Sequence, residues 1–393
     1  MTGRIFVVAV EPSADALGAD LIAALKKRDA TLVFGGIGGA AMAAQGVTSL
    51  FDPAPLAVLG LIEGLQAYPR VVRLADETAA GAIAFKPDAI VLIDAWGFTL
   101  RVAQRLSGKL PQTPLIKYVG PQVWAMRSGR AKTLASVVDH LICIYEFEKP
   151  YYAPFGLPVT VSGHPAFGRF KPGDRAAFRT RHNIAADKRL LLLLPGSRRS
   201  EIAGVAPTLE AAAALVCATR PDVQVACIVS PSVRDEVHAH AATWAFAHLL
   251  IDDADEKDDA FAAGDAAIAA SGTVATEIAL QGTPVVVGYR LGAITWALLS
   301  VMFKPRFATL FNIAGDSEAA PEFLQDRFTA ENVAGAAGAL LDDPTKRAAQ
   351  IAAQNTALIA MGRGGPQAAE IAADAIIDVL KHGASAVRRT AGF

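Results

Sequence analysis

The chain contains few residues that could form disulfides or bind a metal ion. Its three cysteines, Cys143, Cys217 and Cys227, are far apart and match neither a disulfide framework nor the paired spacing of a zinc site. We expect them to be buried thiols in a reducing compartment. The histidines are scattered, and no group of His, Cys and carboxylate residues has metal-ligand spacing. The sequence therefore predicts neither a bound metal nor a cofactor.

Neither an excess of charge nor a long apolar run is present. Lys and Arg total 37 and Asp and Glu total 38, so we expect no nucleic-acid partner, which would favour a basic surface. The most apolar stretch, residues 284–303, is interrupted by Arg290, and its uninterrupted part is too short to span a bilayer. Residues 1–10 lack the features of a secretory signal. We expect a cytoplasmic protein, with any membrane contact at its surface.

What is present is an alternation of short apolar segments and helical patterns, in a chain of 393 residues that is long enough for two domains. Continuous β-branched runs are typical of parallel strands buried on both faces. The predicted strands are 5–10, 32–37, 89–93, 115–119 and 141–144, then 190–194, 223–229, 266–270 and 285–289. A segment rich in Pro and Gly, residues 155–175, separates the two series. The sequence therefore predicts an α/β protein with two doubly wound domains, residues 1–165 and 166–366.

Polar residues follow the predicted strands of the first domain. Open parallel sheets bind ligands outside the carboxyl ends of their strands, and Glu11, Ser13 and Asp94 lie just after such ends. A carboxylate such as Asp94 could accept a proton from a sugar hydroxyl within hydrogen-bond reach. The alternative for Ser13 and Asp94 is a helix-capping or loop role.

Two loops of the second domain suit a nucleotide. Gly196, Ser197 and Arg198 follow one strand and precede a helix, where close backbone approach, the helix start and a guanidinium favour a diphosphate. A second strand ends at another helix start that carries hydroxyls and an acid. Its residues are Ser271, Gly272, Thr273 and Glu277. The alternative is a solvated turn and an ordinary helix cap, but two such loops in one domain favour a nucleotide site.

An apolar segment near residue 60 is followed by the basic Arg70 and Arg73. A core helix is the default interpretation, but apolar surface flanked by basic residues also suits a peripheral contact with anionic lipid. The residues that would make this contact are Leu56, Val58, Leu59, Leu61 and Ile62.

These motifs, in this order, resemble lipid-A-disaccharide synthase, a family of inverting glycosyltransferases. The matching segments are Glu11-Pro12-Ser13 with Asp15, Leu56-Ala57-Val58-Leu59-Gly60, Lys86-Pro87-Asp88, Ile93-Asp94, Tyr118-Val119, Val123-Trp124-Ala125, Phe147-Glu148-Lys149, Gly163-His164-Pro165, Leu194-Pro195-Gly196-Ser197-Arg198 with Glu201, Ala270-Ser271-Gly272-Thr273 with Glu277, Asn312-Ile313, and Pro321-Glu322-Phe323-Leu324-Gln325. The resemblance implies a GT-B fold, in which two Rossmann-like domains face a central cleft. It also implies a C-terminal helix, about residues 367–380, that packs back on the first domain.

The resemblance further implies a reaction: transfer of a diacylated glucosamine from UDP to diacylglucosamine 1-phosphate (lipid X), which gives a β-1,6 disaccharide and UDP. By position, Asp94 is similar to the family's general base, and Glu11 and Ser13 match its active-site loop. Arg198, Glu277 and Asn312 match donor-binding positions. The segment around Leu59 matches a region that contacts the inner membrane, and the family needs no metal.

The first domain departs from the family pattern in several places. Val10 and Ala14 replace two loop glycines, and the segment after Asp94 lacks the usual second acid and asparagine, with Gly97 at the acidic position. The donor side therefore matches the family better than the acceptor side. Three alternatives stay open: a relative with a different acceptor, a nucleotide-sugar epimerase of the same architecture, and a catalytically silent UDP-sugar binder. The sequence also leaves open whether the chain forms a homodimer.

Overall fold

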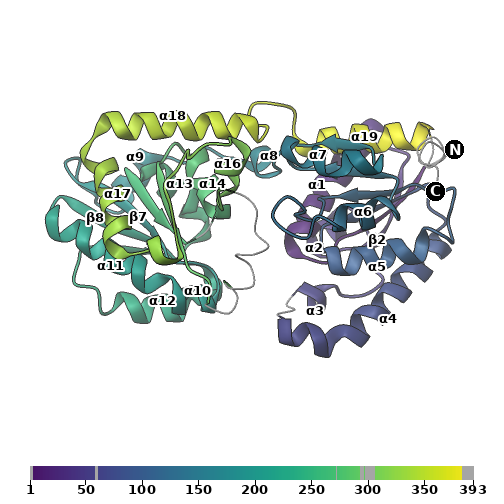
Figure 1. The fold of residues 1–393 in the computed structure, drawn as a ribbon, viewed down its shortest axis with the longest axis horizontal. Helices are drawn as coiled ribbons and strands as arrows, with labels where there is room; N and C mark the ends of the chain where they lie inside the picture. Colours follow the sequence, from purple (N-terminus) through teal and green to yellow (C-terminus); the bar gives the residue numbers. More distant parts are fainter. Residues whose placement is uncertain (1–2, 58–60, 271, 293–295, 297–305, 383–393) are drawn as a thin grey trace. The chain divides into compact units, whose positions relative to one another are not determined.

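The computed structural model describes residues 3–57, 61–270, 272–292, 296 and 306–382. The chain divides into two compact units: unit 1 comprises Met1–Gly168 and Gly362–Phe393, and unit 2 comprises Arg169–Met361. Each unit contains one six-stranded sheet with helices packed against it (Figure 1). The prediction of two doubly wound α/β domains is therefore confirmed.

The sheet of unit 1 is entirely parallel, in the order β2-β1-β3-β4-β5-β6. Its strands are β1 (Arg4–Val8), β2 (Val33–Ile37), β3 (Ala89–Ile93), β4 (Leu115–Tyr118), β5 (His140–Cys143) and β6 (Val159–Val161). Its helices are α1 (Pro12–Arg28), α2 (Ala40–Ala44), α3 (Ala54–Ala57), α4 (Leu61–Phe85), α5 (Trp96–Leu106), α6 (Arg130–Ala135), α7 (Lys149–Tyr152), α8 (Ala166–Arg169) and α19 (Ala368–His382).

The strands of unit 1 are apolar along their whole length because both faces of the sheet are covered. In β1, Phe6 and Val8 join a core cluster that contains residues of α4 and α5, whereas Ile5 and Val7 join a second cluster with Leu21 of α1. Successive side chains of a strand point to opposite faces, so a continuous apolar run fills both cores.

The C-terminal helix α19 completes the second of these cores. Ala372, Ala373 and Ile376 are buried in the same cluster as residues of α1, and the two helices lie side by side in unit 1 (Figure 1). Arg28, in the last turn of α1, donates to Glu370 at 2.5 Å and to Asp374 at 2.6 Å. The helix implied by the family resemblance is thus present, and it belongs to unit 1.

The sheet of unit 2 is also parallel, in the order β12-β11-β10-β7-β8-β9. Its strands are β7 (Arg189–Leu194), β8 (Val223–Ile228), β9 (His248–Ile251), β10 (Ala266–Ala269), β11 (Val285–Tyr289) and β12 (Glu322–Leu324). Its helices are α9 (Arg175–Arg181), α10 (Arg199–Gly204), α11 (Ala206–Thr219), α12 (Arg234–Ala241), α13 (Lys257–Ala263), α14 (Gly272–Leu280), α16 (Leu310–Ala314), α17 (Ala330–Asp342) and α18 (Pro344–Ala360).

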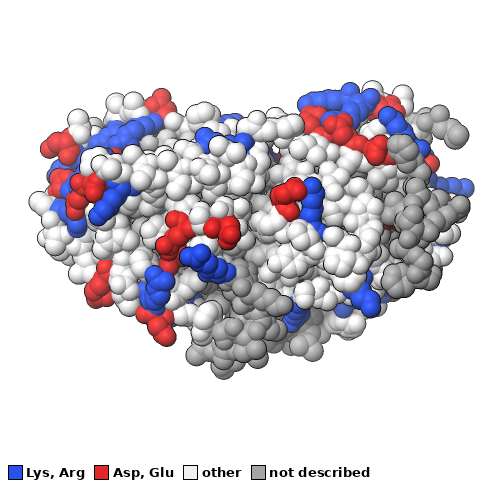
Figure 2. Space-filling view, turned by 45° about the horizontal axis from the view of Figure 1, so that its top comes forward, with Lys and Arg blue, Asp and Glu red and all other residues white. Residues whose placement is uncertain are grey.

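Charges are mixed on the molecular surface. Figure 2 shows Lys and Arg side chains lying next to Asp and Glu side chains on the face in view. Among the described residues, no helix combines the length and the apolar character needed to cross a bilayer.

Candidate functional site

A cavity of about 480 Å³ opens in unit 2 where four strands end. Its lining includes Leu194, Ile228, Ile251 and Ala270, which lie at or just beyond the carboxyl ends of β7, β8, β9 and β10. This is the edge where open parallel sheets bind ligands, and the volume falls within the range of small-molecule sites, about 300–1,000 Å³.

The loop after β7 forms one wall of this cavity. Glu201 is buried, and its Oε2 accepts hydrogen bonds from the backbone amides of Ser197 (2.8 Å) and Arg198 (3.3 Å). Gly196 has a φ of +128°, and a Cβ there would lie 2.6 Å from the Cβ of Glu201. Only glycine fits this backbone. Gly196 and Glu201 therefore shape the loop. The Arg198 side chain, 74% exposed, lines the cavity and pairs with Glu201 Oε1 at 3.1 Å.

The cavity lining also includes a carboxylate and an amine. Lys257, at the start of α13, donates to Glu277 of α14 at 2.9 Å, and both residues line the cavity. Sequence reasoning identified Glu277 but missed Lys257, because Lys257 follows β9, a strand that it did not predict. Of the other predicted residues, Gly272 and Thr273 begin α14, and Ser271 lies outside the described residues.

The structure corrects the predicted role of Asn312 in binding the nucleotide-sugar donor. Asn312 is 0% exposed, and its amide group donates to Ala320 O (2.8 Å) and Glu322 Oε1 (3.1 Å) and accepts from Ala320 N (3.0 Å). These bonds occupy the amide and fix the segment that leads into β12. The residue is therefore structural and is not available to a ligand in this conformation.

Three charged residues gather at the carboxyl ends of neighbouring strands in unit 1. Glu11 follows β1, Asp94 follows β3, and Lys117 lies in β4, in the sheet order β1-β3-β4. The Lys117 amine donates to the backbone oxygen of Asp94 and, at 2.7 Å, to the hydroxyl of Thr99. Sequence reasoning missed Lys117, although a lone lysine inside an apolar strand was a usable signal.

Burial and mutual charge perturb this cluster. Burial lowers the pKa of the Lys117 amine to about 7, although the carboxylates of Asp94 and Glu11 oppose that change. Burial and then the negative charge of Asp94 raise the pKa of Glu11, whereas the Lys117 cation lowers it. Perturbed groups at a strand edge are typical of functional sites, so the cluster is a second candidate region.

The other residues predicted in the first domain are Ser13 and the residues of the lipid contact. Ser13 is exposed in the first turn of α1, two residues after Glu11. Leu56, predicted as a lipid contact, is only 9% exposed and packs in the core of unit 1, so that prediction is wrong. Leu61 and Ile62 begin α4, and Val58 and Leu59 lie outside the described residues.

Within the described ranges, no three His, Cys, Asp or Glu side chains gather in a way that could hold a metal ion.

Solved structures similar to this chain share its two-domain fold. Staphylococcus aureus MnaA bound to UDP is 15% identical with a TM-score of 0.61, and covers 97% of this chain and 96% of its own. A UDP-GlcNAc 2-epimerase from Neisseria meningitidis, bound to UDP-GlcNAc, is 12% identical with a TM-score of 0.59, and covers 96% of this chain and 100% of its own. At these identities the likeness establishes the GT-B type of fold.

Proteins related in sequence are much more similar to this chain than these solved structures are. A lipid-A-disaccharide synthase from Paramagnetospirillum magneticum is 41% identical over 384 residues, covering 96% of this chain and 98% of its own length. One from Rhodospirillum centenum is also 41% identical, covering 96% of this chain and 94% of its own. The sequence profile of the family described as lipid-A-disaccharide synthetase matches residues 5–376. The chain therefore belongs to the lipid-A-disaccharide synthetase family of glycosyltransferases.

Proposed function

We propose that this protein transfers 2,3-diacylglucosamine from its UDP conjugate to 2,3-diacylglucosamine 1-phosphate, forming the β-1,6 lipid A disaccharide and releasing UDP. The observation that carries the proposal is the unit 2 cavity, which Arg198, Lys257 and Glu277 line at the ends of four strands. Family membership supports the reaction, and the UDP-bound proteins of similar fold support the choice of nucleotide.

In this proposal the unit 2 cavity holds the UDP portion of the donor. The Arg198 guanidinium offers a planar fork of donors that matches phosphate oxygens, and the backbone at Gly196 and Ser197 offers close approach. Glu277 accepts hydrogen bonds from the ribose hydroxyls through the carboxylate oxygen that Lys257 does not occupy. Lys257 adds a second positive charge near the diphosphate.

The acceptor reacts at unit 1. In an inverting transfer the acceptor hydroxyl must lose its proton as it attacks the anomeric carbon. Asp94 is the proposed general base, and Glu11 and Ser13 belong to the proposed active-site segment that follows β1. General-base catalysis contributes about 10²–10⁴-fold to the rate.

Because both substrates carry acyl chains, we propose that the protein works in the cytoplasm, bound peripherally to the inner membrane. Tyr68, Arg70 and Arg73 of α4 are exposed, and such amphipathic and basic side chains suit an anionic lipid surface. Co-sedimentation with anionic and zwitterionic vesicles measures this contact. Absence of binding to anionic vesicles would contradict it.

The decisive experiment is a transfer assay. The protein is incubated in detergent micelles with UDP-diacylglucosamine and diacylglucosamine 1-phosphate, and the products are identified by mass spectrometry. We expect disaccharide and UDP in equal amounts, each dependent on both substrates. Isomerisation of an unacylated UDP-sugar without transfer would instead identify an epimerase, and transfer only to another acceptor would identify a divergent relative.

A further inference from the structure

Lys117 is an unusual residue for its position. It lies in β4 between Ile116 and Tyr118 and is only 2% exposed. Burying an amine costs stability unless it is well bonded, and an apolar residue of similar length would serve a buried strand as well or better. Stability therefore does not account for a lysine here, and its bonds and charge need a separate explanation.

The bonds of Lys117 fix the turn that presents Asp94. Asp94 and Ala95 are successive non-glycine residues in the left-handed region, with φ of 46° and 42°. Such a turn persists only where its surroundings hold it. The Asp94 backbone oxygen accepts from both the Lys117 amine and the Thr99 hydroxyl, the latter at 2.7 Å. The Asp94 amide donates to Tyr118 O at 2.9 Å, so β4 and α5 together hold the turn.

The charge of Lys117 acts on the same region. Among the described residues, the charged groups that act on the amine are Asp94, after β3, and Glu11, after β1; α5 meets it with the neutral Thr99 hydroxyl. The cation opposes the effects of burial and of Asp94 on the pKa of Glu11. Two carboxylates near each other repel, and an adjacent cation reduces that repulsion.

We propose that Lys117 is a positioning residue for the transfer reaction, which holds the Asp94–Ala95 turn and places a positive charge beside Asp94 and Glu11. This inference rests on the proposed role of Asp94. Lys117 does not itself take the acceptor proton, because its side chain is buried within β4 with only 2% exposure.

The test compares two variants that lose bonds to the same carbonyl. Lys117→Met removes one of the two bonds to the Asp94 carbonyl together with the charge, and Thr99→Val removes the other bond to that carbonyl and keeps the charge. We expect Lys117→Met to lower kcat by about 10- to 100-fold, part of the roughly 10²–10⁴-fold contribution of a general base, and to move the acidic limb of the pH profile to higher pH. Thr99→Val should leave that limb in place.

A second measurement does not depend on turnover. The Glu11 carboxyl is titrated by ¹³C NMR in the wild type and in Lys117→Met, with Glu11→Gln to assign its signal. We expect a higher pKa in the variant, and thermal melting checks that both proteins are folded. The inference is overturned if the Glu11 titration is unchanged, or if both variants lose equal activity with no shift of the acidic limb. A wild-type protein without transferase activity would refute the proposed function, while the titration would still report on Lys117.

Discussion

Arg198 and Arg199 are adjacent in the chain but lie in different surroundings. Both side chains are exposed and paired with a carboxylate: Arg198 lines the unit 2 cavity and pairs with Glu201 at 3.1 Å, whereas Arg199 pairs with Glu236 at 2.8 Å. We expect Arg198→Ala to weaken UDP binding by about 1.5–3 kcal/mol, the range for a hydrogen bond to a charged group. Arg199→Ala removes a positive charge from the adjacent residue and should leave the affinity for UDP nearly unchanged. Calorimetric titration with UDP measures both, and equal losses would show that only bulk charge matters.

Asp94 provides the second residue-level prediction. Asp94→Asn keeps the size of the side chain but removes the proposed base, so turnover should fall at least about 100-fold, within the range of general-base contributions. UDP affinity should stay near the wild-type value, because the proposed nucleotide site consists of unit 2 residues. Asp76→Asn is the control, since Asp76 is an exposed unit 1 carboxylate paired with Arg105. A variant that transfers sugar at the wild-type rate would make Asp94 a loop carboxylate and Glu11 the next candidate.

At the residue scale, sequence reasoning found residues that follow strands better than residues within them. Asp94 and Arg198 were predicted because a parallel sheet presents its ligand site just after the strand ends. Lys117 lies inside β4, and the apolar pattern of that segment predicted a buried strand without identifying its one lysine as a site residue. Asn312 was assigned to the donor because a motif gives a residue's identity but not its burial. Its three hydrogen bonds within unit 2 became visible only in the fold.

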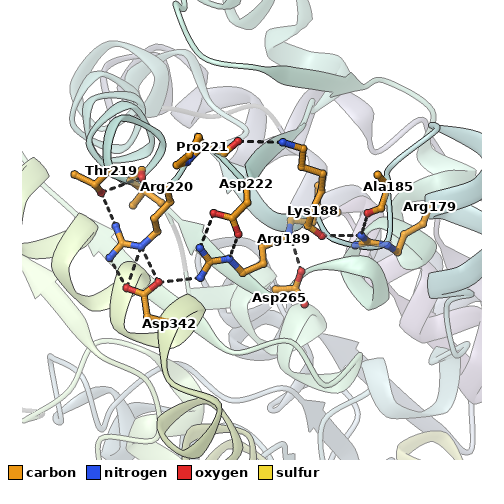
Figure 3. Close-up of polar contacts among 12 residues, drawn as sticks. Arg179, Ala185, Lys188, Arg189, Thr219, Arg220, Pro221, Asp222, Asp265 and Asp342 are labelled. Carbon is orange, nitrogen blue, oxygen red and sulfur yellow. Dashed lines mark hydrogen bonds and ion pairs between the residues drawn. The ribbon is translucent and has the colours of Figure 1, made fainter.

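At the element scale, a network of ion pairs joins the starts of two strands to the end of a helix in unit 2. Arg189, at the start of β7, donates to Asp222 and, at 2.8 Å, to Asp342 at the end of α17 (Figure 3). Arg220 donates to the same Asp342 carboxylate at 2.6 Å. This network lies at the amino ends of the strands, whereas the cavity lies at their carboxyl ends. It can therefore stabilise the sheet without constraining the ligand site.

This network predicts how unit 2 responds to acid. The guanidinium groups of Arg220 and Arg189 lower the pKa of Asp342 to about 2. A carboxyl whose pKa is lower in the folded state stabilises the protein above its unfolded pKa, about 3.9, and loses this effect as the pH falls through its folded value. Asp342→Asn should therefore reduce the free energy of unfolding at pH 7, and the difference should disappear between about pH 4 and pH 2.

Urea unfolding at several pH values measures this dependence. Asp187→Asn, at an exposed position two residues before Arg189, controls for the loss of one negative charge. Because the Asp342 side chain is half exposed, the effect should be small and should weaken further in salt. A stability difference that persists unchanged at pH 2 would mean that Asp342 acts through packing.

The elements that the sequence did not predict share one physical property. β6, β9 and β12 are all edge strands, and most of their residues are only partly buried. Central strands are covered on both faces and flanked by other strands, so they need continuous apolar runs. An edge strand such as β6 has a neighbour on one side only, and its Val-Thr-Val sequence carries too weak a pattern to be recognised.

At the scale of the whole molecule, unit 1 is assembled from two separated parts of the chain. Its last helix, α19, buries Ile376 in a core shared with α1, and full burial of such a side chain contributes about 1.5–3 kcal/mol. A chain ending at Gln367 should therefore destabilise unit 1 and leave unit 2 unaffected. Hydrogen exchange should show lost protection in α1 and β1, with β7 and β8 unchanged.

The matched control removes the ion pairs but keeps the helix. Glu370→Gln with Asp374→Asn abolishes the pairs with Arg28, and partly exposed pairs contribute only about 0–1 kcal/mol each. This double variant should keep most of the protection of α1. Equal loss in both sheets of the truncated chain would contradict an effect confined to unit 1.

The division of the chain also sets an order of events during synthesis. All of Arg169–Met361 lies between the two parts of unit 1, so a ribosome must translate unit 2 completely before it reaches α19. The chain from the end of α1 at Arg28 to the start of α19 at Ala368 spans about 340 residues. At about 5–20 residues per second, the apolar face of α1 waits roughly 17–70 s for its partner. Unit 2, in contrast, is continuous and can fold as soon as it emerges. The nascent chain thus acquires its proposed nucleotide site before the core beneath its proposed acceptor site is closed.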